Sequence, residues 1–171
     1  MRNSDSAKKK TGESPEIFVC RKIKTTKDRN KRFKIIKALS RVNKPWVGEV
    51  LINSLDESCE DIREYLIKEL GQRKDLDLEL VYPKLKALTW YVKSSCLKIL
   101  GMRKNPGAIP EISRILKDPN ADVRATAAWA LGEIGGKEAL ATLSGLTKDE
   151  NNFVRISGEK ALHKASHLKF I

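Results

Sequence analysis

The chain has 171 residues, of which 40% are apolar and 33% are charged, and this balance predicts a globular protein rather than a disordered one. It contains no run of 18 or more apolar residues, so the sequence offers no candidate membrane-spanning helix. The net charge is +12, and residues 1–45 carry +11 of it because they hold 15 Lys or Arg against 4 Asp or Glu. This asymmetry predicts an acidic partner.

The beginning of the chain is its most basic part. We expect residues 1–15 to form a disordered basic tail ahead of a single domain that spans residues 16–171. Residues 21–44 are basic and amphipathic, a pattern that fits a membrane-surface helix, a nucleic-acid-binding helix or a capping repeat. The apolar residues of this segment are in phase with the repeats that follow, which favours a packed repeat that also carries charge.

A basic residue recurs at near-constant spacing along the chain. Successive copies lie 31, 30, 31 and 31 residues apart, and a leucine follows each of them after seven residues. A period of this length is typical of solenoids, in which stacked helical units bury a shared core. The basic residues are Arg32, Arg63, Lys93, Arg124 and Arg155, and the leucines are Leu39, Leu70, Leu100, Leu131 and Leu162.

Each repeat is expected to contain two helices. In the fourth copy, the apolar residues of 123–134 follow helical spacing, and a second apolar segment precedes them at 109–116. The joints are rich in turn and capping residues, as in "KDPNAD" (117–122) and "KDENN" (148–152). We therefore expect five helical hairpins, the first incomplete, over residues 16–45, 46–75, 76–106, 107–137 and 138–171.

The best-formed copy, "DPNADVRATAAWALGEIGGKEAL" (118–140), resembles the HEAT-repeat superfamily. It is most similar to the short phycobilisome-lyase HEAT-like repeat of about 30 residues, and the resemblance extends over residues 30–171. The resemblance implies an all-α, right-handed superhelix of about five HEAT-like hairpins. It implies no particular function, because this fold carries many.

Acidic residues stand six positions before three of the repeated arginines, as Glu57 does before Arg63. In the third copy Ala87 replaces the acid, and the basic residue is Lys93. This paired loss suggests a ladder of charges that links the turns of adjacent repeats, a task suited to the planar fork of arginine.

No catalytic constellation is present, so we expect a protein that is not an enzyme and uses no cofactor. His163 and His167 have a spacing that can bind a metal, but no third ligand accompanies them, and no metal site is expected. HEAT-like iron hydroxylases use repeated His-Glu dipeptides, which this chain lacks. Cys96 falls among the apolar positions of its helix and is interpreted as a core residue. The three cysteines form no CxxC pair, which favours reduced thiols and a cytoplasmic location.

The candidate binding residues lie five positions after each repeated basic residue. Helical geometry directs them away from the core. In the HEAT-type solenoids that the chain resembles, the second helices line the concave face. The five residues are Lys37, Lys68, Lys98, Trp129 and Lys160, and they are flanked by Lys34, Arg41 and Lys164. Such a row could bind an acidic protein segment or a nucleic acid, but it is also the pattern of an ordinary solvated face.

Several functional interpretations therefore stay open. The fold favours a scaffold that binds an acidic protein partner through its concave face, and the charge of residues 1–45 favours a nucleic-acid-binding protein. The resemblance alone suggests an accessory subunit of a bilin-lyase-like complex. The high charge favours a monomer, with Leu168, Phe170 and Ile171 folding back over the end of the stack rather than joining two chains.

Overall fold

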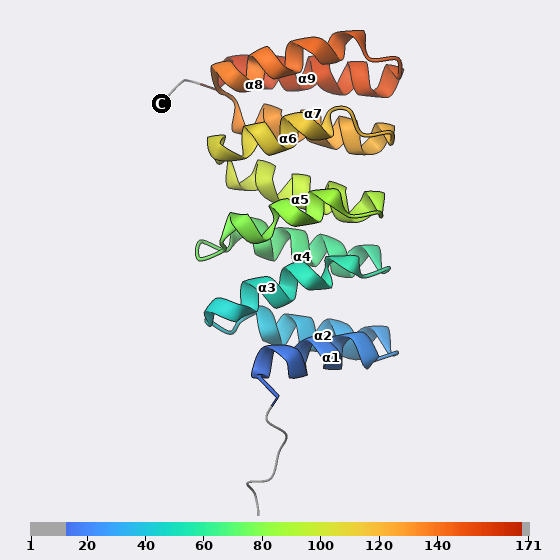
Figure 1. Cartoon of the computed structure of the whole chain (residues 1–171), viewed down its shortest axis with the longest axis vertical. Coiled ribbons are helices and arrows are strands. Elements are labelled where there is room, and N and C mark those ends of the chain that lie inside the picture. The colour runs from blue at the N-terminus through green and yellow to red at the C-terminus, as the bar shows by residue number, and fades with distance from the viewer. Residues whose placement is uncertain (1–12, 169–171) are drawn as a thin grey trace, which may run out of the picture.

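The chain is a stack of five helical hairpins in a computed structural model that describes residues 13–168 (Figure 1). The predicted all-α solenoid of five hairpins is confirmed, and the described residues contain no strand. None of the helices in this range is both long enough and apolar enough to span a bilayer. The paired elements are α1 (Pro15–Thr25) with α2 (Arg29–Ser40), α3 (Pro45–Asn53) with α4 (Glu60–Gln72), the 3-10 helices η2 (Leu78–Leu80) and η3 (Tyr82–Lys86) with α5 (Trp90–Arg103), α6 (Ile109–Ile115) with α7 (Ala121–Ile134), and α8 (Gly136–Leu143) with α9 (Asn152–His167).

Two hairpins differ from the expectation. The first contains two helices of 11 and 12 residues, so it is not incomplete. In the third, two 3-10 helices replace the expected first α-helix, and Pro83 in the second of them has no backbone N–H to donate to an α-helical turn. The predicted tail of residues 1–15 falls largely on residues 1–12, which lie outside the described residues.

Side chains in the joints define where second helices begin. The side chain of Asn120 accepts hydrogen bonds from the backbone N–H groups of Asp122 and Val123 at the start of α7. Asn151 caps α9 in the same way, and Asp28 caps α2. These asparagine and aspartate side chains satisfy N–H groups that the first helical turn leaves without partners.

One continuous apolar core runs through all five hairpins. Four of the five repeated leucines are buried in it, from Leu39 at 5% exposure to Leu131 at 0%. Leu162, in the last described hairpin, is only partly buried. The core therefore accounts for the leucine at a fixed place in every repeat, because each hairpin buries its apolar face against its neighbours.

The glycine after the repeated leucine permits close packing between second helices. A Cβ atom placed on Gly132 would lie 2.9 Å from both the Cα and the Cβ of Ala161 on α9. The indole of Trp129 similarly occupies the space in which a Cβ of Gly101 would lie. Two of the three Leu-Gly pairs thus mark places where the second helices approach closely, and at Gly71 the neighbour is the flexible side chain of Met102.

The arginine at the head of α7 ties two adjacent repeats together. Arg124 Nε and Nη2 each donate a hydrogen bond of 2.9 Å to the carboxylate of Asp149 in the next repeat. Its Nη1 donates to the carbonyl oxygens of Asp118 and Pro119 in its own turn. The side chains of Arg124 and Asp149 are only 8% and 10% exposed, so the pair is largely removed from solvent.

The same ion pair recurs along the stack and forms an ion-pair ladder. Each carboxylate lies 25 residues after its basic partner, in Arg32–Glu57, Lys93–Asp118 and Arg124–Asp149. The predicted link between adjacent turns is confirmed, but the partner carboxylate was assigned wrongly. The acidic residue six positions before an arginine accepts a hydrogen bond from that arginine through its backbone carbonyl. Where its carboxylate forms an ion pair, the partner is the basic residue of the preceding repeat.

The interpretation of the third repeat as a paired loss is also wrong. Lys93 keeps a carboxylate partner, because its Nζ lies 2.6 Å from Asp118 Oδ2. Arg63, one repeat earlier, forms no ion pair with any described residue. Arg155, in the last hairpin, uses its Nη2 to donate to the side chain of Asn152 instead.

Candidate binding groove

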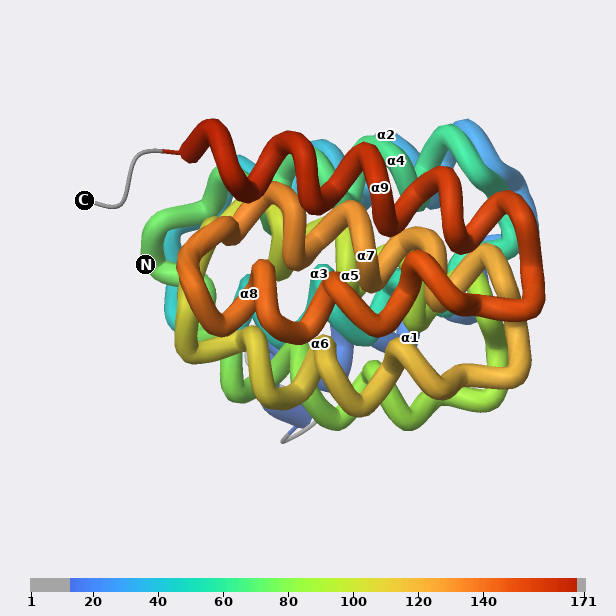
Figure 2. Tube along the Cα trace, turned by 90° about the horizontal axis from the view of Figure 1, so that it is seen from above, coloured from blue at the N-terminus to red at the C-terminus, as the bar shows by residue number. Residues whose placement is uncertain are grey.

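The second helices form one side of the stack, and a groove is hollowed into it. Seen along the stack, α2 and α9 lie on one side and α1 and α6 on the other (Figure 2). A pocket of about 670 Å³ lies on the side of the second helices, where α5, α7 and α9 follow one another. It is lined by Glu64, Ile67, Lys98, Met102, Asp122, Ala125, Thr126, Trp129, Gly132, Phe153, Ser157, Lys160, Ala161 and Lys164.

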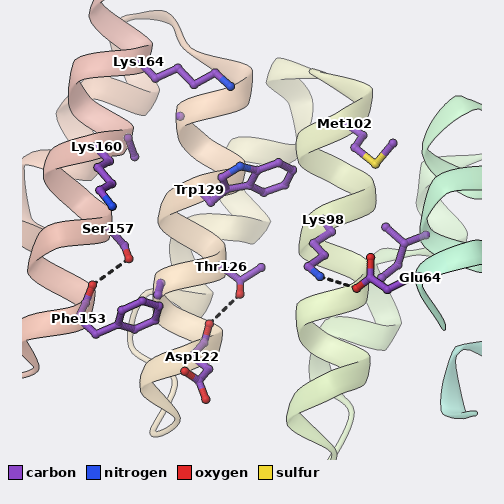
Figure 3. A pocket seen from close by; sticks show the side chains of 14 residues that line it. Glu64, Lys98, Met102, Asp122, Thr126, Trp129, Phe153, Ser157, Lys160 and Lys164 are labelled. Carbon is purple, nitrogen blue, oxygen red and sulfur yellow. Dashed lines mark hydrogen bonds and ion pairs between the residues drawn. The ribbon is translucent and has the colours of Figure 1, made fainter. Parts of the chain in front are cut away.

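The groove exposes three large apolar side chains. Trp129 is 38% exposed, Phe153 is 55% exposed and Met102 is 36% exposed. Trp129 extends from α7 towards α5, and Phe153 extends from the first turn of α9 towards α7 (Figure 3). Met102 packs at Gly71 of α4, and Trp129 packs at Gly101 of α5, so both side chains lie against the adjacent helix. The floor of the groove is therefore apolar.

The charges around this floor are mostly paired. Lys98 Nζ lies 2.7 Å from Glu64 Oε1, and Lys164 forms an ion pair with Glu133 (Figure 3 shows the first of these pairs). Lys160 forms no ion pair with any described residue. The groove is therefore less cationic than a simple count of its lysines suggests.

The structure brings together only half of the predicted binding residues. Lys98, Trp129, Lys160 and Lys164 line the pocket. The other four do not line it, although all four are exposed: Lys34 and Lys37 on α2, Arg41 directly after α2, and Lys68 on α4.

The ammonium of Lys37 lies near aromatic rings of its own helix, α2, and of α4. Its Nζ lies 4.4 Å from the ring centroid of Phe33 and 5.5 Å from that of Tyr65. An ammonium over an aromatic face is attracted by the ring quadrupole, so this lysine is held along the surface.

Sequence reasoning missed Met102, Phe153 and Glu64 as groove residues. The prediction was limited to the position five residues after the repeated basic residue and to nearby basic residues, and the missed side chains lie about one or two helical turns from that position. Met102 is four residues after Lys98, and Phe153 is seven residues before Lys160. Residues at such spacings share one face of a helix, and this spacing is the signal that could have found them.

Reactive side chains do not gather at the groove. Cys96 is fully buried, and this burial raises the pKa of its thiol to about 12, which confirms its interpretation as a core residue. The rings of His163 and His167 lie 4.3 Å apart on the last turns of α9. Within residues 13–168, no group of three or more potential ligands could hold a metal ion.

A family model of HEAT repeats matches residues 78–163, which is half of the chain. The chain belongs to the HEAT-repeat family. The match covers most of the third hairpin, the fourth and most of the fifth, including Met102, Trp129 and Phe153 of the apolar floor of the groove. No curated protein sequence matches the chain significantly.

Solved structures that resemble this HEAT-repeat protein share its fold at low identity. The complex of CpcE and CpcF of phycocyanin lyase from Nostoc sp. PCC7120 has a TM-score of 0.59 and 18% identity, over 97% of this chain and 70% of that one. Human deoxyhypusine hydroxylase has a TM-score of 0.57 and 20% identity, over 80% of this chain and 63% of that one. The chain thus spans less than two thirds of the hydroxylase. An engineered protein has a TM-score of 0.51 and 16% identity, over 88% of this chain and 78% of that one.

Proposed function

We propose that this HEAT-repeat protein is a non-enzymatic scaffold that binds a segment of an acidic protein partner along its second helices. The observation that carries the proposal is the cluster of Trp129, Phe153 and Met102, three large apolar side chains that stay exposed in one groove. Exposed apolar side chains gathered in a concave site with a few polar groups are typical of a binding site.

The lysines around the groove favour a partner with both apolar and acidic residues. Lys160 forms no ion pair among the described residues and borders the apolar floor, so it can pair with a carboxylate of the bound segment. Lys98 and Lys164 already have acidic partners, so their attraction for a further carboxylate is weaker.

The positions of the basic residues along the stack predict the direction in which the partner segment lies. Lys34, Arg41 and Lys68 are exposed on the first two hairpins, and the large apolar side chains of the groove lie on α5, α7 and α9. We expect the apolar part of the partner to lie over α5–α9 and its acidic part to lie over α2 and α4. In this arrangement the two kinds of contact lie on different hairpins of the stack.

A nucleic acid is the second candidate partner. The net charge of +11 on residues 1–45 and the exposed indole of Trp129 favour it, because phosphates attract basic surfaces and bases stack on aromatic rings. The likeness to the phycocyanin lyase complex extends to the fold alone and favours no bilin partner.

Fluorescence titration tests the proposal directly. The Trp46→Phe/Trp90→Phe variant leaves Trp129 as the sole tryptophan, so its emission reports on the groove. Three probes are added in turn: a synthetic peptide of alternating glutamate and leucine, the same peptide with glutamine for glutamate, and a random-sequence single-stranded oligonucleotide. We expect a saturable change with the acidic peptide, and weaker binding of the glutamine peptide.

A matched pair of variants locates the bound peptide. Phe153 and Ile156 are both exposed apolar residues of α9, at 55% and 41%, but only Phe153 lines the pocket. Phe153→Ala should weaken peptide binding about tenfold, and Ile156→Ala should leave it unchanged. Equal effects, or no emission change at all, would reject the groove as the site. Tighter binding of the oligonucleotide with a steep salt dependence would favour the nucleic-acid candidate.

A further inference from the structure

The ion-pair ladder has one vacant position inside the stack, and the intact positions define its geometry. In each of them the acidic residue donates its backbone N–H to the carbonyl three residues before it, as Asp149 does to Leu146. Its carboxylate also accepts a hydrogen bond from the N–H two residues after it, as Asp149 does from Asn151. Glu57 and Asp118 make the same two contacts.

Ala87 occupies this position in the third repeat without a carboxylate. Its N–H donates to the carbonyl of Lys84, three residues before it, and Thr89, two residues after it, is the N-cap residue of α5. The backbone of the vacant position is therefore the same as that of Asp149, and only the acidic side chain is missing. Arg63, one repeat earlier, is the basic residue that this carboxylate would serve. It lies 24 residues before Ala87 rather than 25, because Arg63 and Lys93 are 30 residues apart and the other repeated basic residues are 31 apart.

Arg63 retains half of the contacts that the other ladder arginines make. Its Nη1 donates to the carbonyl oxygens of Glu57 and Ser58, both at 2.7 Å. Its Nε and Nη2, the atoms that hold the carboxylate in Arg124, make no hydrogen bond with any described residue. Neither atom is a buried group without a partner, so both reach solvent.

The vacant position is open and has both apolar and charged neighbours, because Ala87 and Leu88 line a pocket that also contains Lys24, Asp56 and Lys84. The Arg63 guanidinium carbon lies 4.7 Å from the ring centroid of Tyr91, so the ring covers one face of the guanidinium and leaves its edge free. Leu88 is fully exposed beside Ala87, and Trp90 is 50% exposed. The ring centroid of Trp90 lies 6.1 Å from that of Tyr91, and Leu88 lines the pocket that contains Ala87. None of Arg63, Leu88 and Trp90 lines the groove, so this surface is distinct from it.

We propose that Arg63, Leu88 and Trp90 form a second docking site, which takes an aspartate or glutamate of a partner protein together with an adjacent apolar residue. The partner's carboxylate completes the ladder by accepting two hydrogen bonds from Nε and Nη2, as Asp149 does from Arg124. Its apolar neighbour packs on Leu88 and Trp90. The ligand class follows from the chain itself, because a carboxylate fills this place in every intact position of the ladder.

The first experiment fills the vacancy from within the chain. Ala87→Asp restores the missing acid, and Ala87→Asn is the matched control with nearly the same shape and no charge. We expect the aspartate variant to melt about 2–4 °C above the asparagine variant, since about 1 kcal/mol shifts Tm by this amount in a domain of this size. Equal melting temperatures would overturn the proposal, because the position would then not face Arg63.

The second experiment seeks the external carboxylate. A displayed library of random peptides is depleted on the Ala87→Asp variant and then selected on the wild-type chain. We expect enriched peptides with an acidic residue next to an apolar one, and changing that acid to its amide should weaken binding at least about tenfold. The selected peptide should also bind Arg63→Lys more weakly and Phe153→Ala unchanged, which separates this site from the groove.

Three results would reject the docking site. They are a selection that enriches no peptide, an enriched set without acidic residues, and peptides that bind the Ala87→Asp variant as tightly as the wild type. Competition by an oligonucleotide in place of the acidic peptide at the same Arg63-dependent site would also overturn the assignment of a protein partner.

Discussion

Arg124 holds the Asp149 carboxylate of the following repeat through two hydrogen bonds of 2.9 Å, while its third nitrogen binds the carbonyl of Asp118 in its own turn. The guanidinium therefore joins three elements: the turn before α7, α7 itself and the turn before α9. Because both charged groups are about nine-tenths buried, loss of either one removes the main ion-pair partner of the other in a poorly solvated place.

Removing Arg124 should destabilise the stack. We expect Arg124→Ala to lower the free energy of unfolding by about 3 kcal/mol, because it leaves a buried carboxylate without its cation and two turn carbonyls without their side-chain donor. Urea unfolding monitored by circular dichroism measures this. A double-mutant cycle with Asp149→Asn should show strong coupling, and a cycle with Asp118→Asn should show little. The reverse order of coupling energies would contradict the assigned pairs.

The Arg124–Asp149 pair should make stability depend on acid pH. Hydrogen bonds from Arg124 hold the pKa of Asp149 below its ordinary value, although its burial opposes this. The unfolded chain therefore takes up a proton at a higher pH than the folded chain, and acid favours unfolding. The contribution is present in full above about pH 5 and is lost as the pH falls through about 4, towards the lower folded value.

Unfolding in urea between pH 3 and pH 7 measures this dependence. Other carboxylates also contribute to acid unfolding, so the informative quantity is the difference from Asp149→Asn. That variant should lose less stability than the wild type over the acid range. If the free energies of unfolding of the two proteins changed in parallel with pH, Asp149 would have the same pKa in the folded and unfolded states.

The glycines of the Leu-Gly pairs should respond unequally to substitution. At Gly132 a new Cβ meets the backbone of Ala161 at 2.9 Å, and helix backbone cannot yield easily. At Gly71 the nearest atom is the sulfur of Met102 at 2.7 Å, at the flexible end of its side chain. We expect Gly132→Ala to cost about 1–3 kcal/mol. Gly71→Ala should be nearly neutral, because helix propensity offsets about 0.5–1 kcal/mol of the strain. Equal thermal melts would refute the packing argument.

The cysteines should differ in reactivity. Thiolates are the reacting species, and Cys96 is both buried and shifted to a pKa of about 12. Cys59 is only partly buried. With iodoacetamide near neutral pH, mass spectrometry should show label at Cys59 well before Cys96, and Cys96 should react only as urea unfolds the chain. Early label at Cys96 in the native protein would mean that α5 opens locally.

Much of the fold was determined by the sequence alone. The repeated basic residue, the leucine seven positions later and the capping asparagines act through local helical geometry and through burial of one helix face. Because both act within one repeat, five helical hairpins could be predicted without knowing how the repeats contact one another. The burial of Cys96 followed from the same helical periodicity.

Relations between repeats were decided by the tertiary structure. The sequence placed Asp118 six residues before Arg124, but packing of adjacent turns directs the arginine to the carboxylate 25 residues ahead. It also placed Lys98 and Lys164 among the candidate binding residues, and neighbouring helices bring Glu64 and Glu133 to them as ion-pair partners. A repeat pattern specifies which residue types recur, but which side chains meet depends on the rotation and spacing of stacked helices. Those quantities arise only when all side chains between the helices pack together.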